Sequence, residues 1–183
     1  MNKKVLVPIA TGIEEIETMC IVDVLRRSGA NVTIASVDIP QVKAAHEVVF
    51  MADCLIEECK NKIYDLIVLP GGLPGAEYLR DSNTLKELLV EQKKANRLYG
   101  AICASPVFVL AHHKLVDDLV STAYPTLLKK LPIPDKQNLS VVVDKNCVTS
   151  KGPGTALVFA LKLVELLYGE KRAEQIAQEM LVI

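Results

Sequence analysis

Short apolar runs that alternate with helical segments constrain the fold of this chain more than any other feature. Such runs occupy residues 5–10, 31–37 and 65–69. Residues 14–27 lie between the first two and have a helical pattern, with acidic residues early, arginines late and Gly29 as the stop. A strand, a helix and a strand in this order predict a right-handed βαβ unit with parallel strands. The chain is therefore expected to form a doubly wound α/β sandwich around a mostly parallel sheet.

The remaining segments continue the alternation. We expect a hairpin that pairs 43–44 with 48–50, a helix at 83–94, a strand that ends at 103 with a helix from 106, strands at 119–122, 139–143 and 147–149, and helices at 152–168 and 170–180. No linker, repeat or low-complexity segment interrupts this pattern. We therefore expect one domain that covers residues 1–183, a length sufficient for a substantial core.

Composition and charge argue against several classes of partner. Half of the residues are hydrophobic, only 4% are aromatic and Trp is absent, which suits a buried aliphatic sheet rather than an aromatic binding surface. The formal net charge is −1 and no basic cluster occurs, so we expect neither nucleic acid nor an anionic membrane as a partner. Pro8 and Gly12 interrupt the first apolar run, which fits neither a secretory signal nor a membrane span. We therefore predict a cytoplasmic protein.

The five cysteines do not form a recognisable framework. They are Cys20, Cys54, Cys59, Cys103 and Cys147. Their odd number, wide spacing and lack of a C-x-x-C motif argue against a disulfide framework and a zinc site, so we predict no metal. The sequence also lacks a phosphate-binding loop of the P-loop or dinucleotide type, and we predict no cofactor. Except for Cys103, we assign the cysteines to packing or to incidental surface positions.

Residues 100–106, Gly-Ala-Ile-Cys-Ala-Ser-Pro, are the most informative stretch for function. An apolar run ends at Cys103, and an apolar segment opened by Pro106 follows. This pattern predicts a buried strand, a tight turn that carries the cysteine, and a helix, which is the geometry of a nucleophile elbow. Unpaired amides at the helix N-terminus would favour thiolate over thiol. The alternative from this segment alone is a small core cysteine that serves only packing.

A second candidate follows from the face that Glu17 occupies on the first predicted helix. At 100° per residue, Ile21 and Val24 lie within about 40° of Glu17. A lone carboxylate on such an apolar stripe is costly unless it is protonated or paired. We therefore predict that Glu17 has a raised pKa, hydrogen-bonds the Cys103 sulfur and moves protons during catalysis. The alternative is a carboxylate placed for the helix dipole, which fits the two preceding glutamates better.

The same helix is apolar on a further side. Ile16, Met19 and Val22 cluster away from the Glu17 stripe, so the helix is apolar almost all round. One side can cover the sheet, and the other needs a second cover, which is either another helix of this chain or a second subunit. We expect a C₂ homodimer.

The Gly71-Gly72 pair follows the strong strand at 65–69. In open α/β sheets, ligands bind beyond the carboxyl ends of the strands, where this loop and Cys103 should meet. Backbone amides of Gly72 and Ala104 are then placed to form an oxyanion hole. The alternative is a plain strand-to-helix turn, which two glycines also serve.

Four motifs in register resemble the ThiJ/PfpI superfamily. They are Glu-Glu-Ile-Glu-Thr at 14–18, Val-Leu-Pro-Gly-Gly at 68–72, Ala-Ile-Cys-Ala at 101–104 and Thr-Ser-Lys-Gly-Pro-Gly-Thr at 149–155. The chain is most similar to the branch of the human parkinsonism-associated protein deglycase, from the first strand to the last helices. The resemblance implies a flavodoxin-like sandwich that is usually homodimeric and carries an oxidisable cysteine at its elbow.

Carried over to this chain, the resemblance implies that Cys103 is the nucleophile and that Glu17 is its protonated partner. It implies that the amides of Gly72 and Ala104 are the donors, and that Arg27 lines the site from across the dimer. The implied activities are cofactor-independent conversion of methylglyoxal or glyoxal to the hydroxy acid, and removal of early glycation adducts. The implied alternative is oxidative sensing through a cysteine sulfinate, together with a chaperone role.

Two positions depart from the pattern of the relatives. Tyr124 precedes Pro125 where many relatives have a histidine, and a tyrosine donates hydrogen bonds but is a poor base near neutral pH. Schemes that need that histidine are therefore in doubt, whereas a proton shuttle through Glu17 survives. His46 stands where the related pattern has an arginine near the site, so we expect a weaker preference for anions.

An intracellular cysteine peptidase is the rival enzyme hypothesis, and the sequence argues against it. The PfpI branch places a histidine directly after the elbow cysteine, and this chain has Ala104 there. His112 and His113 lie about 13–15 Å along the following helix, so we expect them at the surface or at the helix end.

Overall fold

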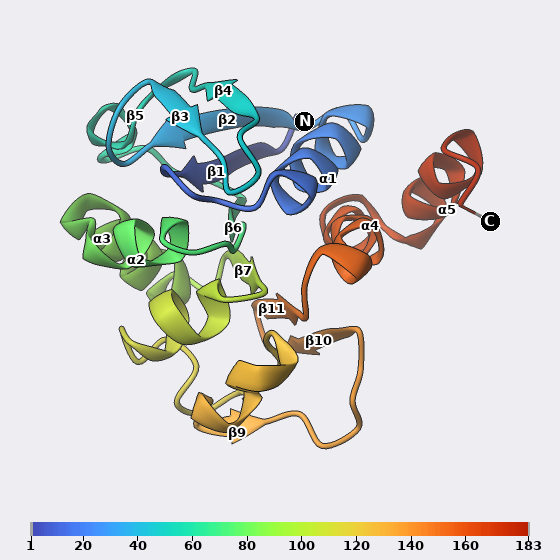
Figure 1. The fold of residues 1–183 in the computed structure, drawn as a ribbon. Coiled ribbons are helices and arrows are strands. Elements are labelled where there is room, and N and C mark those ends of the chain that lie inside the picture. The colour runs from blue at the N-terminus through green and yellow to red at the C-terminus, as the bar shows by residue number, and fades with distance from the viewer. Residues whose placement is uncertain (1, 183) are drawn as a thin grey trace.

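The computed structural model describes residues 2–182 and contains a seven-stranded central sheet within that range (Figure 1). Its strands follow the order β10-β11-β7-β6-β1-β2-β5. In chain order they are β1 (Lys4–Ile9), β2 (Asn31–Ser36), β5 (Cys54–Leu55), β6 (Leu66–Leu69), β7 (Leu98–Ile102), β10 (Val141–Asp144) and β11 (Cys147–Ser150). Neighbouring strands are parallel except β10 and β11, which are antiparallel. The predicted, mostly parallel α/β sheet is confirmed.

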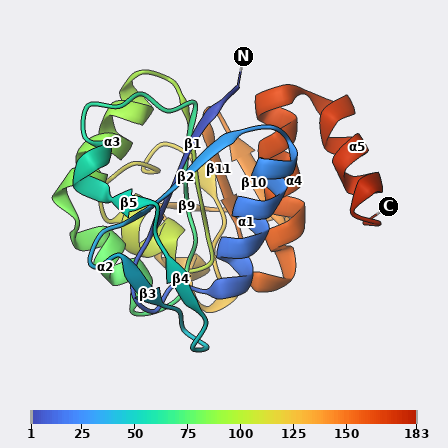
Figure 2. The same cartoon turned by 90° about the horizontal axis from the view of Figure 1, so that it is seen from above.

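Helices cover both faces of this sheet. On one face, α1 (Glu15–Arg27) packs against α4 (Ala156–Tyr168), and α5 (Glu170–Glu179) lies outside α4. On the other face lie α2 (Gly75–Asp81) and α3 (Asn83–Lys94), as Figure 2 shows. Because both faces are covered, the central strands are apolar without alternation, and every residue of β6 is buried. Within the described residues, none of the helices is both long and apolar enough to cross a bilayer.

Several short elements differ from the prediction. The segment after Cys103 forms a π-helix (Pro106–Ala111) rather than an α-helix. The predicted strand at 119–122 is shortened to β8 (Val120–Ser121), which pairs with β9 (Ile133–Pro134) in a small separate sheet. α2, β5, β9 and two 3₁₀ helices (Ile56–Cys59 and Pro125–Lys130) were not predicted. They are too short to carry a periodic apolar signal, and tertiary contacts decide their conformation.

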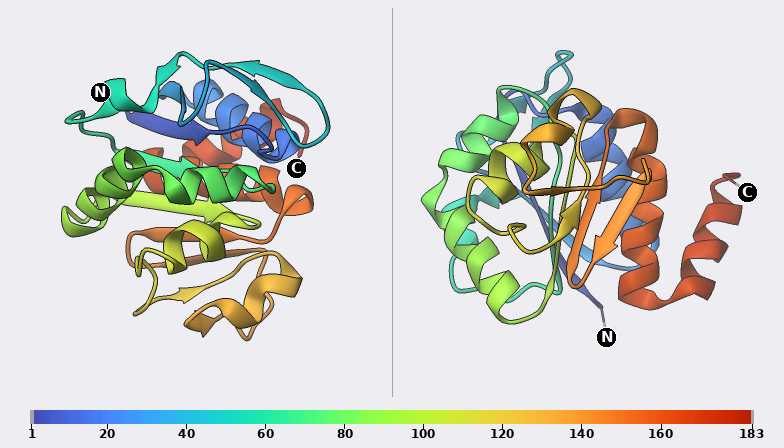
Figure 3. Two further views of the ribbon diagram at one scale, coloured as in Figure 1. Left: turned by 60° about the vertical axis from the view of Figure 1, so that its left-hand side comes forward. Right: turned by 90° about the horizontal axis from the view of Figure 1, so that it is seen from below.

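The predicted hairpin is present as β3 (Gln41–Lys43) and β4 (Val49–Met51). The two strands are antiparallel and lie outside the central sheet, close to β2 and the start of α1 (Figure 3). Val42 of β3 is completely buried and anchors the hairpin, whereas Val49 and Met51 of β4 are exposed. The hairpin therefore adds a surface next to the N-terminal end of α1.

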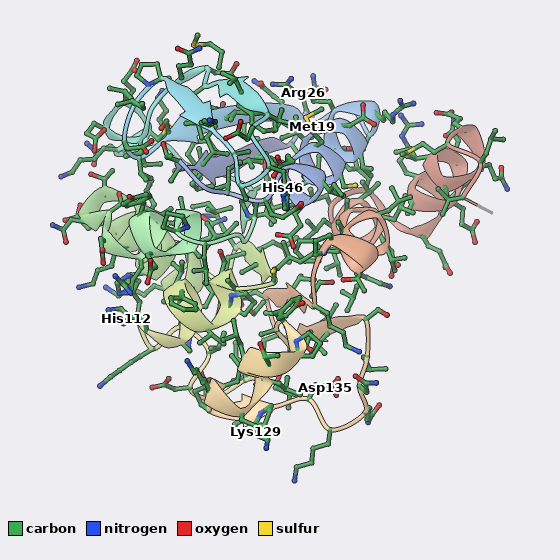
Figure 4. All side chains as sticks on the ribbon, in the orientation of Figure 1. Met19, Arg26, His46, His112, Lys129 and Asp135 are labelled. Atoms are coloured by element: carbon green, nitrogen blue, oxygen red, sulfur yellow. The ribbon has the colours of Figure 1, made fainter. Side chains whose placement is uncertain are left out.

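α1 has a buried side and an apolar exposed side. Ile21, Val24 and Leu25 are completely buried, as expected for the side that faces the sheet and α4. Ile16 and Met19 remain 54% and 50% exposed. Val22, which the sequence pattern groups with these two residues, is only 4% exposed, so the chain itself covers this residue. The uncovered side is therefore narrower than predicted and centres on Ile16 and Met19 (Met19 is labelled in Figure 4).

Candidate active site

Cys103 occupies the sharp turn directly after β7. Its φ angle is +65°, in the left-handed region that a non-glycine residue seldom adopts. Hydrogen bonds on both sides hold this conformation: the Cys103 amide donates to the Ser150 carbonyl at 3.1 Å, and the Tyr124 amide donates to the Cys103 carbonyl at 2.9 Å. The strained turn at the C-terminal end of a central strand matches the predicted nucleophile elbow.

Glu17 reaches the elbow from the first turn of α1. Its side chain is completely buried, and its Oε2 accepts a hydrogen bond from the Gly71 amide at 2.7 Å. Its own amide donates to Oε2 of Glu14, which caps the helix, at 2.7 Å. Its other oxygen, Oε1, has no hydrogen-bond partner among the described residues. One carboxylate oxygen therefore anchors Glu17, and the second remains available for chemistry.

Two glycines allow the loop after β6 to fit between α1 and the elbow. Gly72 has a φ angle of +89°, and a Cβ atom built there would lie 2.5 Å from the Glu14 amide nitrogen. The Gly71 carbonyl accepts a hydrogen bond from that amide at 3.0 Å. A Cβ on Gly71 would lie 2.6 Å from the Cβ of Cys103. Glycine is therefore required at both positions, because any larger residue would push the helix start and the elbow apart.

Replacing Gly71 by alanine is expected to lower the free energy of unfolding by about 1 to 3 kcal/mol, because the added methyl overpacks the elbow. Gly154→Ala is the matched control, because Gly154 is exposed, lacks a positive φ and has nothing within 4 Å of an added Cβ. The control should be unchanged or about 0.4 to 1 kcal/mol more stable. Urea denaturation of both variants measures the difference, and equal stabilities would contradict the close fit.

The carboxyl of Glu17 and the thiol of Cys103 titrate as a pair. Burial raises the pKa of Glu17 to about 7, while the Gly71 amide and the Cys103 thiol act to lower it. Burial first, and then the negative charge of the nearby Glu17 carboxylate, raise the pKa of the Cys103 thiol to about 12. The backbone amides of Gly72 and Ala104 lower it. Between these two pKa values the pair holds a single proton.

The predicted raised pKa of Glu17 is thus confirmed, whereas the predicted preference of Cys103 for the thiolate is wrong, because the pKa of its thiol is raised to about 12. The amides of Gly72 and Ala104 act in the predicted direction. They are outweighed because the sulfur is buried and because a negative charge on Glu17 opposes a second one on Cys103. The thiolate therefore costs less when the proton of the pair lies on Glu17, although burial still opposes it.

A pocket of about 290 Å³ opens in front of the sulfur. It is lined by Gly72, Leu73, Cys103, Ala104, Tyr124, Thr126 and Leu127. The volume lies at the small end of ligand pockets in proteins and suits a small molecule. Four of these residues, Gly72, Cys103, Ala104 and Tyr124, were predicted from the sequence, whereas Leu73, Thr126 and Leu127 were not. No motif marks those three, because the loop after β6, which carries Leu73, and the segment after the elbow, which carries Thr126 and Leu127, meet at the pocket only in the tertiary structure.

Arg27 and His46 do not line this pocket within the chain. Arg27 lies at the other end of α1 from Glu17, about 15 Å along the helix, where it pairs with Asp23 at 2.7 Å. A contribution of Arg27 to the site of a second copy stays a prediction. His46 lies on the β3–β4 turn, outside the pocket lining of the single chain, and its place near the site of an assembled protein stays a prediction.

The surroundings of His46 are acidic. The His46 amide donates to Oε1 of Glu15 at 2.8 Å, and ligand-type atoms of Glu14, Glu15 and His46 lie within 4.8 Å of one another. Figure 4 shows His46 next to the start of α1. His46 therefore contacts the start of α1 and does not line the Cys103 pocket within the described chain.

The other two histidines are also remote from the pocket. His112 lies at the end of the π-helix, on the side of α2 (Figure 4). A ring nitrogen of His113, Nε2, lies 2.9 Å from the carbonyl of Arg80. Because no histidine lines the pocket, a Cys–His catalytic pair of the peptidase type is absent from the described site.

Comparison with known proteins agrees with this geometry. A Toxoplasma gondii structure described as "DJ-1, oxidized" superposes with a TM-score of 0.95 and 44% identity, covering 98% of both chains. "Glutathione-independent glyoxalase DJR-1.2" of Caenorhabditis elegans is 37% identical over 169 residues, 91% of this chain and 89% of that protein.

"Protein DJ-1 homolog B" of Arabidopsis thaliana is 44% identical over 180 residues, which cover 98% of this chain. The chain spans 41% of that protein and 47% of the related Arabidopsis homolog A, so it corresponds to about half of each. The family model described as "DJ-1/PfpI family" matches residues 3–166. With the strained elbow cysteine, the buried glutamate and these similarities, the chain belongs to the DJ-1/PfpI family.

Proposed function

We propose that this chain is a glyoxalase III or deglycase-type enzyme that acts on methylglyoxal and glyoxal through Cys103, without a cofactor. The observation that carries this proposal is the Cys103 sulfur in a small pocket near the buried carboxyl of Glu17, whose Oε1 has no hydrogen-bond partner among the described residues. A nucleophile, a proton acceptor and two amide donors are thus collected around one position where a carbonyl carbon can sit.

The reaction begins with transfer of the thiol proton to Glu17 as the sulfur adds to the aldehyde carbon of methylglyoxal. The carbonyl oxygen becomes a hemithioacetal oxyanion, which the amides of Gly72 and Ala104 stabilise until Glu17 passes the thiol proton to it and is again a carboxylate. Glu17 then removes the hydrogen from the former aldehyde carbon and returns a proton to the neighbouring carbon, which yields a thioester of lactate. Water hydrolyses the thioester, releasing lactate and restoring the thiol.

The properties of Glu17 support this role. A general acid–base group is most effective when its pKa lies near the working pH, and burial raises the pKa of Glu17 to about 7. Tyr124 on the pocket wall can donate a hydrogen bond to the substrate but does not replace a basic histidine. The name of the Caenorhabditis elegans relative supports the same reaction, and early glycation adducts present a related carbonyl-derived carbon to the same sulfur.

A second candidate function uses the same sulfur as an oxidation sensor. Cys103 is only partly buried, and the similar Toxoplasma gondii protein is described as oxidized. Oxidation to a sulfinate would place negative oxygens near the amides of Gly72 and Ala104, with a protonated Glu17 as a further donor. Loss of aldehyde turnover after treatment with peroxide, together with a mass increase of two oxygens on Cys103, would support this function.

We further propose that the working form is a homodimer. The half-exposed Ile16 and Met19 on α1, with the exposed Val49 and Met51 of the adjacent hairpin, support it. Exposed apolar residues grouped in this way are typical of a surface that another subunit covers.

The proposed activity is tested by measuring lactate formed from methylglyoxal by the purified wild-type protein, in the absence of glutathione and added metal. We expect turnover whose kcat/KM rises with pH to a plateau, with an apparent pKa near 7, because the pair must lose its first proton before the sulfur can attack. A profile that is flat between pH 5.5 and pH 8.5 would contradict the role of Glu17. The absence of any lactate would overturn the enzyme proposal.

A further inference from the structure

A second pair of thiols lies at the edge of the sheet. Cys54 is in β5, and Cys59 ends the 3₁₀ helix that follows (Ile56–Cys59). Their Sγ atoms are 3.7 Å apart, and both cysteines are free. Cys54 is partly exposed, whereas Cys59 is completely buried. One thiol can therefore be reached from solvent, and the second lies directly behind it.

The local backbone holds these sulfurs close together. β5 pairs with β2, with Cys54 opposite Ala35. The 3₁₀ helix is capped by Glu58, whose Oε1 accepts a hydrogen bond from the Leu55 amide at 3.1 Å. A disulfide needs a sulfur separation of about 2.05 Å, so the sulfurs must approach by about 1.7 Å. Side-chain rotation at the partly exposed Cys54 supplies most of a movement of that size.

This pair is separate from the candidate active site. In the order of the central sheet, β1, β2 and β6 lie between β5 and β7, the strand that ends at Cys103. With a spacing of about 4.8 Å between neighbouring strands, the two thiol sites are about 19 Å apart across the sheet. Chemistry at Cys54 and Cys59 therefore leaves the Cys103 pocket free, and it does not depend on the function proposed for that pocket.

We propose that Cys54 and Cys59 form a reversible intramolecular disulfide by exchange with a low-molecular-weight disulfide such as glutathione disulfide. The Cys54 thiolate attacks one sulfur of glutathione disulfide, which forms a mixed disulfide and releases one glutathione thiolate. The Cys59 thiolate then attacks the Cys54 sulfur and displaces the second glutathione. Two protein thiols are oxidised to one disulfide, and one glutathione disulfide is reduced to two glutathione molecules.

Proximity favours the second step over accumulation of the mixed disulfide. Cys59 is held next to the Cys54 sulfur, so its attack is intramolecular and proceeds at a high effective concentration. Burial, and then the neighbouring Cys59, raise the pKa of Cys54 to about 11, so the thiolate is scarce at neutral pH and the first step is slow. The site is thus suited to respond to a sustained oxidising poise rather than to a brief pulse.

The test is equilibration of the reduced full-length protein with glutathione buffers of increasing disulfide content, until the composition no longer changes. Remaining thiols are alkylated, and peptides are mapped by mass spectrometry. We expect a disulfide between Cys54 and Cys59, detected as a peptide mass 2 Da below that of the form with two free thiols. This disulfide should disappear on return to excess reduced glutathione. Cys54→Ser and Cys59→Ser should each abolish the link.

Cys20→Ser is the matched control, because Cys20 is partly exposed like Cys54, and this variant should retain the link at the same buffer composition. Aldehyde turnover of Cys54→Ser should stay within two-fold of the wild type. Alkylation of both Cys54 and Cys59 at every buffer composition would overturn the proposal. A stable glutathione adduct on Cys54, or a disulfide from Cys54 to another cysteine, would overturn the proposal as well. If a variant folds poorly, the measurement on the wild-type protein alone decides whether the proposal holds.

Discussion

Replacing Cys103 by serine is expected to reduce lactate formation from methylglyoxal by about 10⁴-fold or more. Sulfur is the better nucleophile, and its thiol is far more acidic than a serine hydroxyl, so Glu17 can accept the proton of the first but not of the second. The remaining contacts of the elbow are made by the backbone of residue 103, and serine preserves them. The loss therefore reports on the sulfur and not on the fold.

The measurement is kcat/KM for methylglyoxal in metal-free buffer, with circular dichroism and urea denaturation to verify folding. Cys20→Ser is the control, because it removes a partly buried thiol on α1 that lies outside the pocket. The control should keep wild-type turnover within a factor of about two. Residual activity of Cys103→Ser within ten-fold of the wild type would place the chemistry on another residue.

Replacing Glu17 by glutamine is expected to reduce turnover at pH 7 by about 10²- to 10⁴-fold, the usual contribution of a general acid–base group. Glutamine keeps the size of the side chain and an oxygen for the Gly71 amide, but it cannot accept the thiol proton. Without the charge of Glu17 the pKa of Cys103 falls from about 12, while burial still acts to raise it. The remaining activity should therefore rise only at alkaline pH.

The same substitution is expected to stabilise the protein at alkaline pH. The pKa of Glu17 is raised from its ordinary value of 4.5 to about 7 on folding, so the native state binds this proton more tightly than the unfolded state. The free energy of unfolding of the wild type accordingly falls as the pH rises from 4.5 to 7, by about 3 kcal/mol from this group. Glu17→Gln lacks this decrease. It should match the wild type near pH 4 and exceed it by up to about 3 kcal/mol at pH 8.

Urea denaturation at pH 4, 6 and 8 measures this difference. Glu174→Gln is the control. Glu174 is exposed on α5, and its substitution by glutamine removes the same formal charge. Its stability should follow the wild type within about 0.5 kcal/mol at each pH. A Glu17→Gln protein that is less stable than the wild type at pH 8 would show that Glu17 is a net stabilising carboxylate, contrary to its burial. Slower turnover with higher stability would instead mark Glu17 as a residue retained for chemistry.

Local patterns in the sequence were sufficient to predict the central strands and helix α1, and to identify the main residues of the candidate site. The long apolar runs of β1, β2, β6 and β7 and the capped helix α1 are strong local signals, and the structure forms each of them as predicted. Glu17 could be singled out because a charged residue on an apolar helical stripe is visible in the spacing alone. Cys103 could be identified because an apolar run that stops at a cysteine before a proline-opened segment indicates an elbow.

Only the tertiary structure decided properties that depend on residues far apart in the chain. The raised pKa of Cys103 results from burial and from Glu17, which arrives from α1, and no local pattern contains that information. Leu73, Thr126 and Leu127 meet around the pocket because two separate loops fold over the elbow.

Cys54 and Cys59 are five positions apart, a spacing without a motif, and a strand that turns into a 3₁₀ helix brings their sulfurs to 3.7 Å. Periodicity and residue chemistry therefore determined which groups this protein carries. Burial and three-dimensional proximity, which set the cost of each charge and the partner of each thiol, decided how these groups act.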